Sequence, residues 1–87
     1  MNNWDRAKTQ GSAHYRAGDT QPIDLYREAG AFTPFALCSI IKYAYRCLVR
    51  GVQDSDLVKI RHYAGLLRAD RMDTEAIATN QFQGAKE

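Results

Sequence analysis

The sequence has few of the residues that disulfide scaffolds and metal sites use. Its 87 residues include two cysteines and two histidines, and there is no CxxC pair. Cys38 and Cys47 are nine residues apart on one expected helix, which puts them on opposite faces and roughly 13 Å apart along its axis. They cannot bridge each other. We expect two reduced, buried cysteines and no metal site or resident cofactor.

Long hydrophobic runs and strong net charge are also missing. The longest apolar runs are far shorter than the roughly 20 residues that span a bilayer, and MNNWDRAKTQ lacks the apolar core of a signal peptide. The formal net charge is +2, without a run of Lys and Arg, which is too weak to indicate nucleic acid. We therefore expect a soluble, cytoplasmic protein with no membrane or nucleic-acid partner.

What the sequence does contain is helical pattern, clearest over residues 33–51. Thr33 and Pro34 are typical of a helix start, and Gly51 is typical of a helix end. Apolar residues recur between them at spacings of three and four and predict one wide core face: Leu37, Cys38, Ile41, Ala44, Tyr45 and Leu48. If this face is the core, Leu48→Ala should cost about 2–5 kcal/mol of stability.

A second pattern on the same helix is cationic. Lys42, Arg46 and Arg50 recur at spacing four, and no acidic residue lies between Gly30 and Asp54. This spacing predicts a basic edge without a local counter-charge.

The remaining pattern predicts an all-α fold. A short helix is expected over Pro22–Ala29, and a third helix from Asp54 or Ser55 to about Met72, with Leu57, Ile60, Ala64 and Leu67 as its apolar stripe. The short 51–53 connection predicts an antiparallel hairpin of the second and third helices. The expected organisation is a mobile arm over 1–13, a helical domain over 14–72, and a tail over 73–87 with a possible short helix. So small a core favours a homo-oligomer.

Several side chains suit a nucleotide. The loop residues His14 and Tyr15, followed by Arg16, could stack on a base and donate to phosphate, or could merely be a surface loop. Lys59 and Tyr63 share one edge of the third helix beside His62. Periodicity does not decide whether that edge lies along Lys42 and Arg46 or points elsewhere.

The order and spacing of these motifs resemble a small family of tailed-phage proteins. The motifs that carry the resemblance are His14-Tyr15 with Gly18, Gln21-Pro22-Ile23-Asp24, Ile41-Lys42-Tyr43 with Arg46, and Asp56-Leu57 with Lys59 and Tyr63. The family is catalogued as a domain of unknown function and is related to the nucleotide kinase of T7-like podoviruses. Where the family tends to carry Gly-Asn, this chain has Cys38-Ser39.

The resemblance implies a phage origin, a helical oligomer and a nucleotide site. By position it assigns ligand binding to His14, Tyr15, Lys42, Tyr43, Arg46 and Lys59, with no catalytic residue identified. The first hypothesis is a protein that sequesters a nucleotide or nucleotide-derived immune signal and so counters host defence. The second is phosphoryl transfer to a nucleoside monophosphate with Mg²⁺ and ATP, although the chain has no GxxxxGK[ST] loop. The third is an inhibitor that binds a host defence protein.

Overall fold

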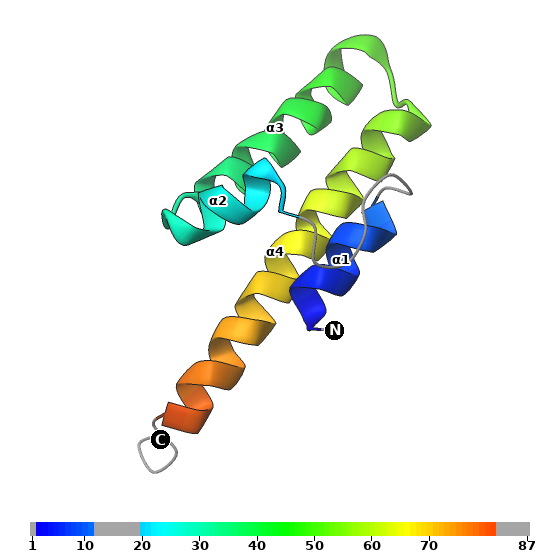
Figure 1. The fold of residues 1–87 in the computed structure, drawn as a ribbon. Helices are drawn as coiled ribbons and strands as arrows, with labels where there is room; N and C mark the ends of the chain where they lie inside the picture. Colours follow the sequence, from blue (N-terminus) through cyan, green and yellow to red (C-terminus); the bar gives the residue numbers. More distant parts are fainter. Residues whose placement is uncertain (1, 12–19, 82–87) are drawn as a thin grey trace.

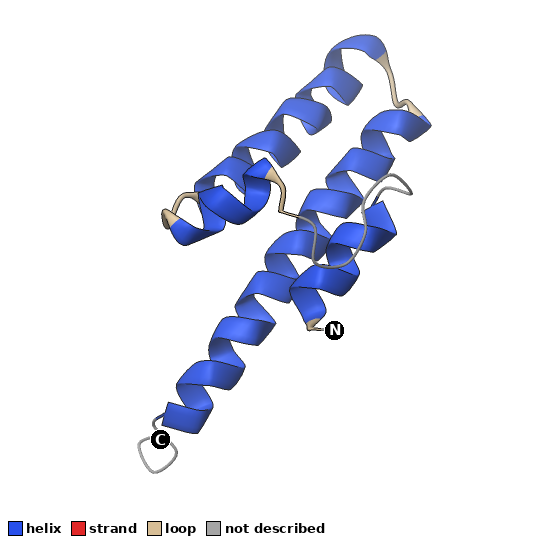
Figure 2. Ribbon diagram, viewed as in Figure 1, coloured by secondary structure: helices blue, strands red, loops and turns tan. Residues whose placement is uncertain are grey.

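The fold consists of four helices in the part of the chain that the structure, a computed structural model, describes, residues 2–11 and 20–81. They are α1 (Asn3–Gly11), α2 (Pro22–Glu28), α3 (Phe32–Arg50) and α4 (Asp54–Gln81). In Figure 1, α3 and α4 run side by side as the expected hairpin, α2 lies against α3, and α1 lies against α4. Figure 2 shows no strand among the described residues. The all-α prediction is confirmed.

A glycine with positive φ follows two of the helices, and for α3 it is the Gly51 that the sequence predicts. After α2, the amide of Ala31 donates to the carbonyl of Tyr26 (2.8 Å), and this wrap requires the positive φ of 76° at Gly30. After α3, Gly51 has a φ of 95°, and its amide donates to the Cys47 carbonyl (3.0 Å). A side chain at either position would be strained, so these two residues fix the turns on both sides of α3.

The start of α3 differs from the prediction. The helix begins at Phe32 after an Ala31 N-cap, so Thr33 and Pro34 lie within the first turn and Thr33 is not the cap. Proline is accepted there because the first amides of a helix have no intrahelical partner. The extra residue brings Phe32 into the core, where its side chain is buried.

The predicted core face of α3 was wrong. The buried cluster consists of Trp4, Phe32, Ala36 and Leu66, and on α3 it uses the side that carries Phe32 and Ala36. The apolar face expected to be core is exposed instead, with Leu48 at 84% and Ile41 at 65%. Cys38 is exposed and Cys47 is partly exposed, so neither is the buried residue expected, although both thiols are free.

The apolar stripe predicted for α4 was also misplaced. Leu66 and Ala69 are its buried apolar residues, whereas Leu57 is 45% exposed and Ala64 is exposed. Ile60 and Leu67 are half-buried. The α4 surface that faces α3 and α1 is therefore rotated from the predicted stripe toward Tyr63 and Leu66.

Most of the mobile arm predicted for residues 1–13 is helical instead, because residues 3–11 form α1, whereas residues 1, 12 and 13 lie outside the described residues. Trp4 is 2% exposed, and its ring meets Phe32 edge to face with centroids 4.9 Å apart. Its indole N–H donates to Asp24 Oδ1 (2.7 Å), and the Arg27 guanidinium lies 4.4 Å from its ring centroid. The rest of the segment is mainly polar, so its composition does not indicate that Trp4 packs into the core.

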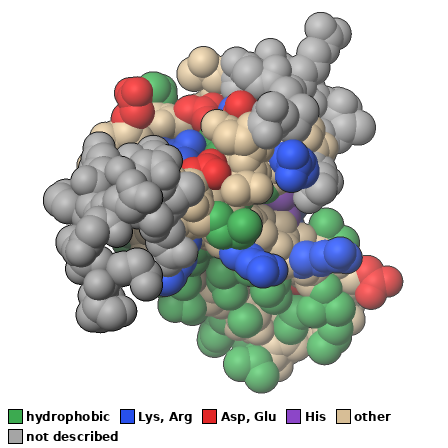
Figure 3. Space-filling model, turned by 90° about the horizontal axis from the view of Figure 1, so that it is seen from below, with side chains coloured by type: hydrophobic (Ala, Val, Ile, Leu, Met, Phe, Trp, Pro, Cys, Tyr) green, Lys and Arg blue, Asp and Glu red, His purple; other side chains and the backbone are tan. Residues whose placement is uncertain are grey.

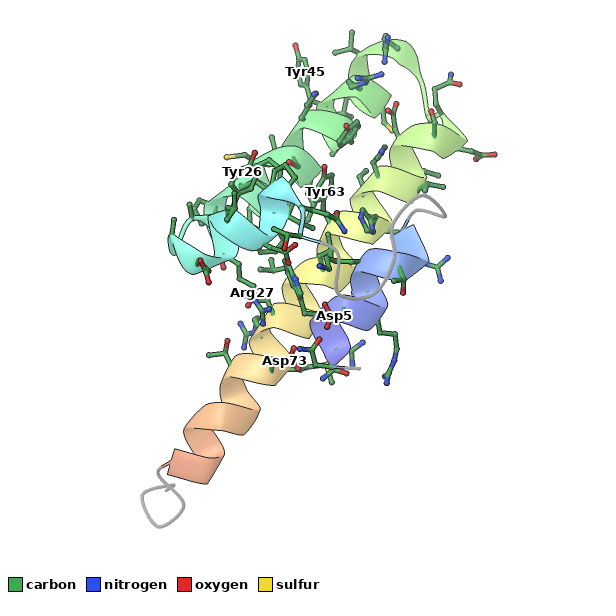
Figure 4. The ribbon with its side chains drawn as sticks, viewed as in Figure 1. Asp5, Tyr26, Arg27, Tyr45, Tyr63 and Asp73 are labelled. Carbon is green, nitrogen blue, oxygen red and sulfur yellow. The ribbon has the colours of Figure 1, made fainter. Side chains whose placement is uncertain are left out.

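Charged side chains tie α1 and α2 to each other and to α4. Lys8 pairs with Asp24 (3.0 Å), and Arg27 pairs with Asp70 (2.6 Å) and Asp73 (3.6 Å). Asp73 also accepts from the Trp4 amide (3.2 Å). In Figure 4, Arg27 extends from α2 toward α4, and Asp73 lies on α4 beside the start of α1. Residues from three helices therefore hold Trp4 in place.

Helix α4 continues past the predicted boundary at Met72 to Gln81. Residues 73–81 contain neither glycine nor proline, so no residue in the segment stops the helix. Asp73, assigned to the tail from sequence, is half-buried and part of the α1 contact. Among the described helices, none combines the length and the apolar character that crossing a membrane requires.

Candidate functional site

The facing surfaces of α3 and α4 bring two tyrosines together. Tyr43 lies two turns after the buried Ala36, and Tyr63 lies one turn before the buried Leu66, so each tyrosine is on the inward side of its helix. Their rings are nearly parallel, with centroids 6.3 Å apart and an interplanar angle of 16°. In Figure 4, Tyr63 points from α4 toward α3. We call Tyr43, Tyr63 and the charged side chains around them the hairpin site.

Two cations of α3 flank the Tyr43 ring. Lys42 Nζ lies 5.3 Å from the ring centroid, and the Arg46 guanidinium carbon lies 5.5 Å from it. Both are within the distance at which a cation is attracted to the negative face of an aromatic ring. Lys42, Tyr43 and Arg46, three of the residues expected to bind a ligand, therefore form one contiguous group.

The prediction that the basic edge lacks a counter-charge was wrong, because Asp56 of α4 pairs with Arg46. Arg46 Nε lies 3.3 Å from Asp56 Oδ1, and the Asp56 side chain is almost fully buried. The sequence pattern of α3 does not reveal this partner, because Asp56 lies on the other helix of the hairpin. The pair is not fully satisfied: Arg46 Nε and Asp56 Oδ2 are buried without a hydrogen-bond partner.

Lys59 places a further positive charge on α4 one helical turn before Tyr63, and His62 adjoins Tyr63. The Lys59 side chain is exposed, and the His62 ring lies 5.6 Å from the Tyr63 ring. Burial of the imidazole and the positive charge of Lys59 both lower the pKa of His62 below its usual value of 6.5. With its pKa lowered below 6.5, the His62 imidazole is mainly neutral at pH 7.

The charges of the hairpin site leave a positive balance. Lys42, Arg46 and Lys59 contribute three positive charges, and Asp56 removes one. Neither lysine pairs with a carboxylate among residues 2–9 and 20–74, whose side chains the structure describes. A net charge of about +2 beside an aromatic pair can attract an anion that also carries a planar group.

Not all the expected ligand residues can be compared with this geometry. His14 and Tyr15 lie outside the described residues. Lys42, Tyr43 and Arg46 lie together, whereas Lys59 is exposed on α4, where its charge lowers the pKa of His62. Asp56 was not identified from sequence as a site residue, and Tyr63 was not included among the ligand-binding residues. The spacing of four residues between Lys59 and Tyr63 was a usable signal for Tyr63.

The described residues offer no grouping of three or more His, Cys, Asp or Glu side chains suited to a metal ion. Arg46 and Asp56 are the charged pair at the centre of the site. A guanidinium can donate to phosphate oxygens, and a carboxylate with a free oxygen can accept from a hydroxyl or an amino group. The arrangement therefore suits recognition of a polar anion by charge and stacking.

Comparisons with known proteins identify a family. No curated protein matches the chain, and no solved structure matches it. A family model described as a protein of unknown function (DUF3310) matches residues 9–65. The matched range is about two thirds of the chain and contains every residue of the hairpin site. The chain therefore belongs to the DUF3310 family.

Proposed function

We propose that this protein is a phage nucleotide-binding protein that sequesters a nucleotide or a nucleotide-derived immune signal in the infected host cytoplasm and so counters host defence. The observation that supports the proposal most is the pairing of Tyr43 with Tyr63, their rings 16° from parallel, with two cations of α3 at the Tyr43 ring. Stacking surface and positive charge are the two features that nucleotides need from a protein.

Each part of the hairpin site has a role in this proposal. The base stacks on the Tyr43–Tyr63 pair, and Lys42 and Arg46 donate to phosphate oxygens. Lys59 adds positive charge on the α4 side, which supports the approach of an anion. The buried Asp56 Oδ2, which has no hydrogen-bond partner, supports the same view, because a ribose hydroxyl can donate to it.

The site is better suited to holding a ligand than to transforming one. The carboxylate nearest the cations, Asp56, is occupied by Arg46, and the His62 imidazole is held neutral. Phosphoryl transfer to a nucleoside monophosphate, which the likeness to a phage nucleotide kinase suggests, remains the alternative activity. It requires Mg²⁺ and ATP, so it makes a separate prediction about the product.

Calorimetric titration tests the proposal with named probes: AMP, dTMP, ADP-ribose and a cyclic dinucleotide. We expect at least one of them to bind with a one-site isotherm. Lys42→Ala should weaken that binding about 10- to 100-fold, the scale of one charge-assisted contact, without change in helicity because Lys42 is exposed. The Tyr63→Leu variant should weaken it by a similar factor through lost stacking.

Arg61→Ala is the matched control. Arg61 is an exposed cation two residues before Tyr63, which places it on the far side of α4 from the hairpin site. This variant should bind like the wild type. Equal losses in Lys42→Ala and Arg61→Ala would indicate attraction by overall charge alone and would refute the site, and the absence of binding to any probe would refute the function.

A further inference from the structure

One side of α3 carries a continuous row of exposed hydrophobic side chains. Its large members are Leu37, Ile41, Tyr45 and Leu48, which are between 47% and 84% exposed. We call this row, with Ala44 at its centre, the α3 outer face. In Figure 4, Tyr45 projects from α3 on the side away from α4. Figure 3 shows hydrophobic side chains gathered over a broad area of the molecule, with Lys and Arg side chains along its edge.

The α3 outer face points away from the intramolecular contact. At about 100° per residue, Leu37, Ile41 and Leu48 lie roughly 100–160° around the helix from Ala36 and Tyr43, which face α4. Helix α3 is therefore apolar on two separate sides, and its charged residues form a narrow flank between them. A helix that is apolar on nearly all sides is normally buried on all of them, so the hairpin leaves α3 half covered.

The size of the exposed surface matches a protein interface. The exposed fractions of the four large residues together equal about two and a half whole side chains, on the order of 500 Å². Exposed Cys38, Ala44 and Val49 on the same side of α3 bring the total to roughly 700 Å², close to the area of about 800 Å² that each partner contributes to a standard interface. A single apolar patch on a monomer rarely exceeds a few hundred Å².

We propose that a second copy of this chain covers the α3 outer face, with the two α3 helices packed antiparallel about a two-fold axis. The row is centred in α3, so a two-fold axis near Ile41 and Ala44 places Leu37 of one copy level with Leu48 of the other. The small Ala44 permits close approach of the two helices at the crossing. The face is thus complementary to itself, which is the condition for a symmetric dimer.

Charge favours the antiparallel arrangement. The outer face itself contains no charged residue, so pairing buries none. Lys42, Arg46 and Arg50 lie on the flank and toward the C-terminal half of α3. A parallel pair would place these cations beside their own copies, whereas an antiparallel pair sends Arg46 and Arg50 of the two copies toward opposite ends and also opposes the helix dipoles. This inference is independent of any nucleotide, because it depends only on the apolar face.

Sedimentation equilibrium of the full chain tests the proposal. The wild type should sediment at twice the chain mass of 9.8 kDa, or at an even multiple of it. Leu48→Lys should raise the dimer dissociation constant at least 100-fold, with the helicity of the wild type, because Leu48 is 84% exposed within one chain. Val58→Lys is the matched control: Val58 is 59% exposed but lies on α4, so this variant should dimerise normally.

A mixing experiment tests the antiparallel register. Leu37→Glu and Leu48→Lys should each be monomeric alone, and an equimolar mixture should form a heterodimer in which the introduced charges of opposite sign face each other. A wild type that stays monomeric, or one that dimerises equally well as Leu48→Lys, would overturn the proposal. So would a monomer that binds vesicles of anionic phospholipid through this face, because the covering surface would then be a membrane. Two variants that fail to pair would overturn the antiparallel register.

Discussion

Trp4 offers the sharpest test of the fold, because the sequence pattern places it in a mobile arm and the structure places it in the core. The structure buries it against Phe32 and gives its indole N–H to Asp24. Truncation of a buried tryptophan to alanine costs about 3–5 kcal/mol. A domain of this length has a total stability of about 4–13 kcal/mol, so Trp4→Ala removes a large part of it.

Two variants separate the contributions of the Trp4 side chain. Trp4→Phe keeps an aromatic ring against Phe32 but loses the N–H donated to Asp24, so it should cost less, about 1–3 kcal/mol. At about 4–8 °C per kcal/mol, Trp4→Ala should lower the melting temperature by at least about 12 °C and Trp4→Phe by clearly less. Thermal and urea unfolding followed by far-ultraviolet circular dichroism measures both.

Fluorescence provides a second reading of the same prediction. Trp4 is the only tryptophan of the chain, so its emission reports the α1 contact without labelling. The folded protein should emit at the short wavelengths of a buried indole and shift to longer wavelengths as the helices unfold. Trp4→Ala with wild-type stability, together with emission typical of an exposed indole, would refute the packing of α1 and restore the mobile arm.

Three further predictions concern the core and two titratable groups. Leu66→Ala should cost about 2–5 kcal/mol of stability because Leu66 is fully buried, whereas Leu48→Ala should cost less than about 0.5 kcal/mol in dilute monomer. Urea unfolding of both variants tests the rotation of α3, and a larger loss in Leu48→Ala than in Leu66→Ala would contradict it. The imidazole of His62 should titrate below pH 6.5 by NMR, and Lys59→Gln should raise its pKa. Because the pKa of His62 is lower in the folded protein than in the unfolded chain, the free energy of unfolding should decrease as the pH falls from 6.5 toward the folded pKa. An unchanged pKa in Lys59→Gln would show that Lys59 is too distant. Burial alone would raise the pKa of Asp24, but hydrogen bonds from Trp4, Gln21 and Lys8, with the charge of Lys8, lower it below 3.8. The stabilisation from the Asp24 carboxylate is therefore present above pH 3.8 and is lost as the pH falls through the folded pKa. Asp24→Asn should be less stable than the wild type at pH 7 and nearly as stable in strong acid, and denaturant unfolding at both pH values tests this.

The helix hairpin was predictable because its signals are local. Gly30, Gly51 and Pro22 act on their own neighbours, and the short 51–53 connection determines that α3 and α4 are antiparallel. The rotation of α3 was not predictable, because both of its sides are apolar. Periodicity selects the wider row, which includes Leu37 and Leu48, although the chain packs the side with Phe32 and Ala36 against its core.

Contacts between distant residues account for the other differences. Trp4 depends on Asp24 and on Asp73, which is 69 residues away, so no local pattern predicts that α1 is anchored. The Arg46–Asp56 pair depends on the register between two helices, which a single helix pattern does not contain. The grouping of Lys42 and Arg46 was predictable because the two residues are four apart on one edge of one helix, whereas Tyr43 entered the prediction through the family resemblance.

Recovery of a bound nucleotide tests the central claim most directly. Purified protein is incubated with the four nucleotide probes, with and without Mg²⁺ and ATP, and the free small molecules are chromatographed before and after the protein is denatured. Sequestration predicts that one probe disappears from the free fraction and returns chemically unchanged on denaturation, and that Lys42→Ala retains far less of it. A probe that returns with an added phosphate would contradict sequestration and assign a kinase, and probes that all stay free and unaltered would contradict nucleotide binding itself.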